Sequence, residues 1–319
     1  MMALWSNDMN IVTITEVEYL SLLMKYKKNI PIWCGQEALN CYQNKELIKV
    51  KKNDKDLAVF LIPIDKNGVR RKYRYFPYLM PIILDNQNNV KLKEIYIIIF
   101  NYLFNKYDYV FVPLHPDFKL VAAIASQGGL VEMRHTHIVN KKMIFEELNS
   151  KLRNHIKNAK KKVELIIDTN YQDYDFSEAI KGSKEEQDER TKCAKKIIDN
   201  NNGYVVKVKY ENQIIAGLII VFDNEWAYLL HSYQKKGFVR GVVSYMILSA
   251  VDYAFDVMKV EHFDFEGSVI DEIDDFFSSF NADIITYPYI IFSKTKDGFE
   301  KLVNRSINID GRVKKYERN

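Results

Sequence analysis

One helix in the second half of this chain is apolar on almost every side. Between Gly241 and Met258, residues such as Val242, Met246 and Val251 place apolar side chains on almost every side of the helix. A helix of this kind is stable only when the rest of the protein covers it all round. We therefore predict that this helix is buried in the folded protein.

Strand-like runs of β-branched and aromatic residues occur throughout the chain. They cover 57–63, 72–76, 109–112, 136–139, 163–167, 205–210, 214–222, 226–232, 262–265 and 284–292. Helical patterns begin near Thr15 and cover 36–42, 122–125, 142–162, 185–200, 241–258 and 271–280. The run 95–104 fits a buried helix and a buried strand equally well. Paired strands followed by strand, loop, buried helix and strand predict an α+β fold, a mixed sheet with helices on its faces.

A basic helix divides the chain near its middle. The length of 319 residues corresponds to about two domains of roughly 150 residues each. Within 142–162 the apolar positions Leu148, Leu152 and Ile156 recur at helical spacing, and the opposite face is rich in lysine. We therefore predict domains at 1–145 and 146–319. The Lys160–Lys162 run fits a solvated helix end better than a binding patch.

Charge and hydropathy narrow the classes of function. Lysine and arginine number 46 against 42 acidic residues, and a net charge of +4 does not by itself indicate a nucleic-acid-binding protein. The most apolar run, 95–104, is half the length of a membrane span and contains Asn101, so no membrane span is predicted. The first residues lack a basic start followed by a long apolar stretch, which argues against a signal peptide.

The three cysteines are Cys34, Cys41 and Cys193, an odd and widely spaced set. No CxxC pair or histidine–cysteine cluster has the spacing of a zinc site, so no metal is expected. A disulfide framework is not expected either, and free thiols fit a reducing cytoplasm.

A glycine-bearing loop lies between the strand 226–232 and the apolar helix. It runs from Gln234 to Gly241 and contains Gly237 together with the cations Lys235, Lys236 and Arg240. The first turn of a helix exposes unpaired N–H groups at the positive end of the helix dipole, which suits a phosphate or another anion. We therefore predict an anion site here, formed by Gln234, Lys235, Gly237, Arg240 and Gly241.

The order of motifs resembles the GNAT superfamily of N-acyltransferases. Gln234 and Gly237 follow its pattern of Gln or Arg, two residues, Gly, one residue, then Gly or Ala, although Val239 departs at the last position. Phe263–Ser268 and Phe280–Ala282 are similar to the "FDFGGS … FGA" ending of the Fem-like branch. Residues 134–138 and 152–161 resemble the "RYT" strand and "RRNIRKAEK" helix of that branch. The resemblance covers roughly residues 30–295.

The resemblance implies two GNAT-like domains in one chain and transfer of an acyl group to an amine. The donor is an acyl-coenzyme A in many relatives and an aminoacyl-tRNA in the peptidoglycan-bridge enzymes. Those enzymes usually carry a long antiparallel helical arm, whereas residues 171–202 of this chain hold one short polar helix. The expected reaction is therefore transfer from acyl-CoA to an amino-sugar or to a nucleotide- or lipid-linked precursor of the cell envelope. The alternatives are a tRNA-dependent aminoacyltransferase and a catalytically inactive binding module.

Acyl transfer needs a base that takes a proton from the amine and a hydrogen-bond donor that stabilises the oxyanion. Asp264 and Glu266 alternate with phenylalanines, so both carboxylates would share one strand face beside the donor site. Glu266 is the first candidate for the base and Asp264 the second; both are equally well explained as hydrogen-bonding anchors. His231, near the end of the preceding strand, is a third candidate with a structural alternative.

Four further residues are candidates for binding the substrate. Arg74 and Tyr75 lie in a run where cations alternate with aromatic rings, and they match the family's "YRF" segment. Such a run suits a phosphate or a sugar, and a charged hairpin edge explains it almost as well. Ser268 is placed to bind substrate or to cap a helix, and Tyr233 to protonate the leaving thiolate or only to pack.

Overall fold

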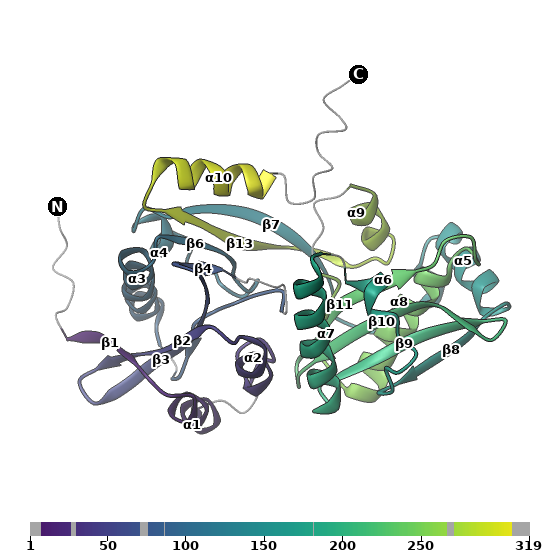
Figure 1. The fold of residues 1–319 in the computed structure, drawn as a ribbon, viewed down its shortest axis with the longest axis horizontal. Coiled ribbons are helices and arrows are strands. Elements are labelled where there is room, and N and C mark those ends of the chain that lie inside the picture. The colour runs from purple at the N-terminus through teal and green to yellow at the C-terminus, as the bar shows by residue number, and fades with distance from the viewer. Residues whose placement is uncertain are drawn as a thin grey trace, which may run out of the picture.

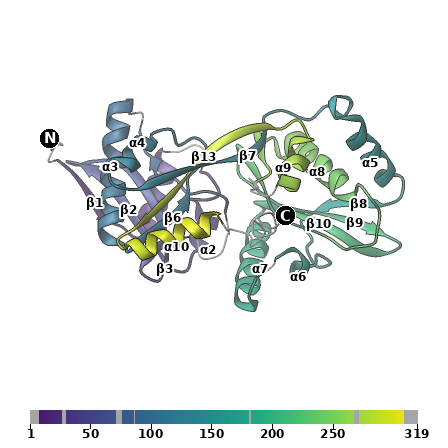
Figure 2. The same cartoon turned by 90° about the horizontal axis from the view of Figure 1, so that it is seen from above.

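The computed structural model describes residues 8–26, 30–70, 76–85, 87–180, 182–266 and 271–307, which form two lobes side by side (Figure 1). One sheet of 13 strands continues through both lobes. The two strands that cross between the lobes are β7 (Leu130–Val139) and β13 (Asp283–Ser293), which Figure 2 shows from above. The fold is α+β, with a mixed and mostly antiparallel sheet flanked by helices, as the sequence predicted.

The first lobe follows the order strand, two helices, three strands, helix, strand, helix, strand. These elements are β1 (Met9–Thr13), α1 (Glu16–Tyr26), α2 (Gln36–Cys41), β2 (Lys45–Lys52), β3 (Lys55–Asp65), β4 (Gly68–Arg70), α3 (Asn89–Lys106), β6 (Tyr109–Pro113), α4 (Val121–Ala125) and β7. A two-residue strand, β5 (Ile82–Ile83), also pairs with β3. The ambiguous run 95–104 is helical. Its helix α3 begins where the Asn88 side chain accepts a hydrogen bond from the Lys91 amide.

The second lobe repeats the same order of elements. They are β8 (Glu164–Asp168), α6 (Phe176–Ala179), α7 (Lys184–Asp199), β9 (Gly203–Tyr210), β10 (Gln213–Phe222), β11 (Trp226–Gln234), α8 (Val242–Tyr253), β12 (His262–Asp264), α9 (Asp271–Ser278) and β13. Helix α8 ends in a π-helical turn at Ala254–Met258. A 3₁₀ turn at Phe145–Glu147 and helix α5 (Ser150–Lys160) precede this repeat, and helix α10 (Lys296–Ile307) follows it.

Strand pairing is also repeated in the two lobes. In the first lobe β1, β2, β3 and β4 are antiparallel neighbours, and β6 pairs parallel to β4. In the second lobe β8, β9, β10 and β11 are antiparallel neighbours, and β12 pairs parallel to β11. Each lobe therefore contains one parallel pair inside an otherwise antiparallel sheet.

The last strand of each repeat completes the sheet of the other repeat. Strand β13 ends the second repeat but pairs antiparallel with β6 of the first lobe. Strand β7 ends the first repeat but pairs antiparallel with β12 of the second lobe. The two exchanged strands also pair with each other along nine residue pairs. This exchange joins the two lobes through backbone hydrogen bonds as well as through the covalent chain.

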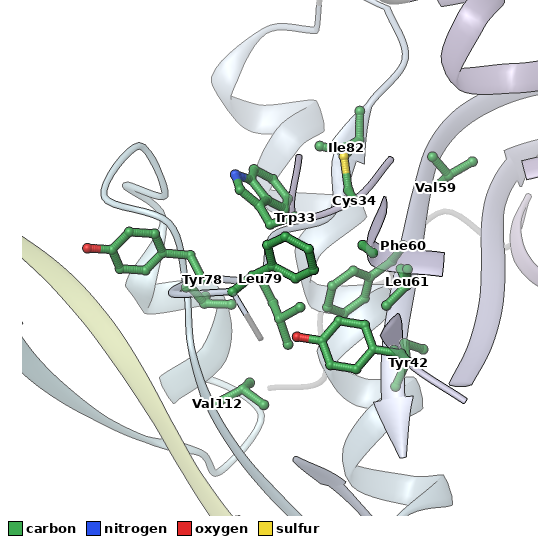
Figure 3. Close-up of a cluster of buried hydrophobic side chains, with 14 of the residues drawn as sticks. Trp33, Cys34, Tyr42, Val59, Phe60, Leu61, Tyr78, Leu79, Ile82 and Val112 are labelled. Atoms are coloured by element: carbon green, nitrogen blue, oxygen red, sulfur yellow. The ribbon is translucent and has the colours of Figure 1, made fainter. Parts of the chain in front are cut away.

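The main hydrophobic core extends from the first lobe into the second. It contains Trp33 and Phe60 from the first lobe together with Ile197 and Tyr228 from the second, each of them 2% exposed or less. Figure 3 shows part of this cluster, in which Trp33 lies between Tyr78 and the strand that carries Phe60. A second core lies under α5 and α8. Helix α8 contributes to it Val242, Met246 and Val251, which are fully buried, as its composition required.

Helices α2 and α7 join the lobes by a disulfide between Cys41 and Cys193, whose Cα atoms are 5.4 Å apart. The prediction of free thiols was therefore wrong for these two cysteines, and Cys34 alone remains a free thiol. The pair was missed because 152 residues separate its members, and only the docking of the lobes brings them together. Because Cys41 and Cys193 form a disulfide, the cysteines no longer indicate a reducing compartment.

Helix α5 is shorter than the predicted helix 142–162. The side chain of Asn149 accepts a hydrogen bond from the Leu152 amide at 2.8 Å and so starts the helix at Ser150. Strands β1, β2, β4 and β5 and helices α6 and α10 were not predicted. Residues 72–75 of the predicted strand 72–76 lie outside the described residues. Among the described residues no helix is long and apolar enough to cross a membrane. The division at residue 145 stays a prediction, since the sheet continues across it.

Candidate functional site

Strands β11 and β12, the parallel pair of the second lobe, separate after a short paired stretch, and the opening between them is called the fork. Strands β11 and β12 pair over only three residue pairs, from Trp226–His262 to Tyr228–Asp264. Beyond Tyr228, strand β11 continues to Gln234 and pairs with β10 on one side only, among the strands that the structure describes. The edge Leu229–Gln234 therefore presents backbone N–H and C=O groups toward the mouth of the fork.

A bulge lies at the point where the fork opens. On strand β10, Ile219 faces His231 and Ile220 faces Leu229, so Leu230 is an extra residue in β11. A bulge locally breaks the ladder and re-aims the neighbouring groups, and bulges are over-represented next to active sites. The bulge residue Leu230 thus lies two residues beyond Tyr228, the last residue of β11 that pairs with β12.

The loop Gln234–Gly241 closes the wide end of the fork and leads into α8. Gly237 and Gly241 both adopt left-handed backbone conformations, with φ of 86° and 89°. The N-cap residue of α8 is Gly241, which has no side chain with which to cap the helix. The first turn therefore keeps its N–H groups and the positive end of its dipole directed at the loop. Lys236 and Arg240 are exposed on the same loop.

Val239, which departs from the family pattern, turns toward the core under α5 and α8 and packs against it. Its neighbour Phe238 is 39% exposed and contacts the ring of Tyr210. The cofactor-binding candidates Gln234, Lys235, Gly237, Arg240 and Gly241 thus lie together on one loop at one helix start.

Gly241 also sets how closely α5 approaches this loop. A Cβ on Gly241 would lie 2.4 Å from the backbone oxygen of His155, whereas a Cβ on Gly237 would meet nothing within 4 Å.

Both glycines adopt a left-handed backbone, so a Gly237 variant is a control for a Gly241 variant and differs from it in the space around the added Cβ. We expect Gly237→Ala to lower the free energy of unfolding by about 1 kcal/mol. Gly241→Ala should lower it by about 3 kcal/mol. Urea unfolding of both variants measures the difference; equal losses would contradict the close approach.

Asp264 is fully buried at the narrow end of the fork. It accepts hydrogen bonds from the Tyr78 hydroxyl at 2.8 Å, the Thr136 hydroxyl at 2.5 Å and the Glu266 amide at 2.7 Å. Burial raises the pKa of this carboxyl, and the hydroxyl donors oppose that shift. Because Tyr78 comes from the first lobe and Thr136 from an exchanged strand, this carboxyl also fixes the lobes together.

Glu266 lies two residues beyond Asp264, half-buried, with a left-handed φ of 58°. The predicted strand 262–265 ends at Asp264 instead, so strand alternation does not determine where the Glu266 side chain lies. Its backbone amide is nevertheless held by Asp264. The two carboxylate candidates are therefore linked directly, and Asp264 controls the backbone that carries Glu266.

His231 and Tyr233 lie on the side of β11 that faces α6 and α7. The Nδ1 atom of His231 lies 3.2 Å from an Arg190 guanidinium nitrogen. Burial and the Arg190 charge hold the pKa of this histidine well below its usual value, so it is neutral near pH 7. The Tyr233 hydroxyl accepts a hydrogen bond from the Asp175 amide at 3.3 Å, and burial raises its pKa.

The sequence-based site is only partly described by the structure. Arg74, Tyr75 and Ser268 lie outside the described residues. Tyr78, Thr136 and Arg190 were not predicted, although Thr136 falls within the 134–138 motif. No group of three histidine, cysteine or acidic side chains in the described part of the chain is placed to hold a metal ion.

The fold has counterparts among solved structures. No protein-family model and no curated protein matches this chain. FemX aligns with a TM-score of 0.60 at 10% identity, covering 88% of this chain and 96% of FemX. A tandem GNAT protein from the clavulanic acid biosynthesis pathway gives 0.56 at 7% identity, over 89% and 97% of the two chains. L-PGS from Bacillus licheniformis gives 0.55 at 9%, over 91% and 96%. At these identities the likeness concerns the fold, and the protein therefore has the tandem GNAT fold.

Proposed function

We propose that this protein transfers an acyl group from an acyl-CoA to an amine. The acceptor is proposed to be an amino-sugar, or a nucleotide- or lipid-linked precursor of the cell envelope. The observation that carries the proposal is the fork between β11 and β12, which opens at a bulge and leads to a helix whose N-cap residue is a glycine. An extended thioester fits an open strand edge, and its phosphates fit the helix start.

In this proposal the loop binds the donor's phosphates. The N–H groups at the start of α8 and the cations Lys235 and Arg240 provide charge of the right sign. Val239 packs inward, so its branched side chain lies against the core. The acyl carbonyl is then placed near Leu230, where β11 has backbone groups outside the regular ladder.

The reaction forms a C–N bond and breaks the C–S bond of the thioester. The amine attacks the carbonyl carbon, a base takes the proton that the nitrogen releases, and the thiolate leaves and is protonated. We propose Glu266 as that base, because it lies next to the fork and is held by its backbone at Asp264. Asp264 is proposed to position Glu266, since its own oxygens already accept three hydrogen bonds. His231 is the remaining candidate for proton transfer.

The test measures coenzyme A binding by calorimetry and thiol release from acyl-CoAs in the presence of amino-sugar nucleotides. The Lys235→Ala/Arg240→Ala variant is expected to bind coenzyme A at least 10-fold more weakly. Glu266→Gln should lower kcat about 100-fold or more with unchanged coenzyme A affinity. Lys160→Ala/Lys161→Ala serves as the control, because these cations lie at the end of α5 and outside the loop.

Two results would count against the proposal. If the protein neither binds coenzyme A nor releases thiol from acyl-CoAs, acyl-CoA is not its donor. Binding of aminoacyl-tRNA that weakens steeply with salt and is reduced by the control substitutions would instead favour the tRNA-dependent alternative.

A further inference from the structure

A second hollow lies between the lobes, at the opposite end of β11 from the loop. It is a cavity of about 70 Å³ lined by residues of both lobes: Pro31, Trp33, Met80, His115 and Asp117 from the first, and Asp223, Glu225 and Trp226 from the second. Trp226 begins strand β11, and Gln234 lies eight residues further along it, roughly 26 Å away at the rise of a strand. This cavity is therefore separate from the proposed donor site.

Aromatic rings form the floor of this cavity. The His115 ring stacks on Trp33, with ring centres 5.5 Å apart, and meets Trp226 edge-on at 5.0 Å. Figure 3 shows the indole nitrogen of Trp33 on the side turned away from Phe60 and Leu61. Indole rings attract cations through their electron-rich faces, and tryptophan is the strongest of the aromatic residues in this respect.

Carboxylates surround the rings. The three acidic residues lining the cavity are Asp117, Asp223 and Glu225, and none of the eight lining residues is a lysine or an arginine. A hydrogen bond with His115 lowers the pKa of Asp117, which therefore carries a negative charge at neutral pH. Asp223 is fixed by backbone amides of both lobes, Ile32 and Trp226, each at 2.9 Å. The cavity therefore has a negative rim over an aromatic floor.

His115 supplies an independent sign of a ligand. It is only 2% exposed, and its Nδ1 lies 3.3 Å from an Asp117 carboxylate oxygen and 3.3 Å from the Asp117 backbone nitrogen, whose N–H can donate to it. Its other ring nitrogen, Nε2, is buried and has no hydrogen-bond partner among the residues that the structure describes. In the tautomer whose Nδ1–H faces the Asp117 carboxylate, Nε2 presents a lone pair to an N–H donor. In the other tautomer Nδ1 accepts from the Asp117 amide and Nε2 carries the proton, so a bound ammonium selects the first tautomer. A buried acceptor without a donor is costly, and an N–H group bound in this cavity would relieve that cost.

We propose that this cavity binds an alkylammonium group, the head of a small primary amine or of a longer molecule that ends in one. The ammonium would contact Asp117 and Glu225 at the rim and donate to His115, with its carbon chain against Trp33 and Trp226. A single water molecule needs roughly 10–15 Å³, so the cavity has room for a few heavy atoms and not for a sugar or a nucleotide. This proposal does not depend on the proposed acyl transfer, because the cavity lies at the other end of strand β11 from the loop Gln234–Gly241.

Methylammonium chloride is the probe for this site, and the indole N–H resonances of Trp33 and Trp226 report its binding in tryptophan-labelled protein. We expect saturable shifts with a Kd of about 6 mM or weaker, because the ceiling on affinity per heavy atom sets this limit for a probe of two heavy atoms. Sodium chloride and methanol at equal concentration control for ionic strength and for a neutral group of similar size. Neither should give a saturable shift.

Two variants separate the cavity from general surface charge. Asp117→Asn and Glu225→Gln change exposed carboxylates, so they should leave the fold intact and weaken methylammonium binding at least 5-fold each. The matched control is Glu261→Gln, an exposed carboxylate next to β12 that does not line the cavity, and its Kd should equal that of the parent protein. Shifts that never saturate, or a Kd that neither cavity substitution changes, would overturn the proposal.

Discussion

Cutting the chain between its two repeats is expected to abolish folding of both pieces. The fragment 1–145 keeps β7 but lacks β13, and the fragment 146–319 keeps β13 but lacks β7. Each fragment would then expose the unpaired edge of a parallel pair together with an unpaired long strand. We expect neither fragment alone to give a cooperative unfolding transition or native near-ultraviolet dichroism, and both to be prone to aggregation. The two fragments expressed together should recover both properties.

A chimera distinguishes strand exchange from a general need for the second lobe. The start of β13 lies beside the end of β7, where Asp283 pairs with Ile138. Joining residues 1–140 to 282–307 through a short turn would therefore form a hairpin that closes the first sheet in one chain. This chimera is expected to regain a cooperative transition that fragment 1–145 lacks. If fragment 1–145 folds as well as the chimera does, the exchanged strand is not required.

Removal of the bridge between Cys41 and Cys193 should cost about 3–5 kcal/mol of the free energy of unfolding. The estimate is large because the bridge closes a loop of 152 residues, which strongly restricts the unfolded chain. The bridge also ties α2 to α7 at the contact between the lobes. Urea unfolding of Cys41→Ala/Cys193→Ala beside the oxidised parent protein measures the loss.

Reductant provides the control for this experiment. It should destabilise the parent protein by a similar amount and leave the double variant unchanged. The Cys34→Ala variant lacks the remaining buried thiol but retains the bridge, so it should respond to reductant as the parent protein does. A midpoint of the parent protein that is the same with and without reductant would rule out a stabilising bridge.

Local patterns predicted most of the fold. Helix α8 and strands β9, β10 and β11 were predicted from the spacing of the apolar residues within each element. The tertiary structure did not override these local patterns. Strand β2 was missed because lysines interrupt its apolar alternation, although Leu47 and Ile48 are buried. The repeat itself appears in the order of elements rather than in any similarity of residues between the lobes.

The candidate site stays a prediction, and the sequence pointed only to those of its residues that are neighbours in the chain. The loop Gln234–Gly241 carries its glycines and cations within eight residues, so it was visible in the sequence. Tyr78 reaches Asp264 across 186 residues and Thr136 reaches it across 128. Those contacts depend on how the lobes dock and on the exchanged strand, which no local pattern specifies. The disulfide was hidden for the same reason.

The exchange of strands also has a consequence for synthesis on the ribosome. When Val139 has been made, β6 and β7 still lack their partner β13, which ends roughly 150 residues later at Ser293. At about 5–20 residues per second, that interval lasts roughly 8–30 s. During this time the nascent first lobe carries open strand edges, which are sites of association with other chains. Slow elongation through the second repeat should therefore lower the yield of native protein, and a chaperone that shields extended strands should restore it.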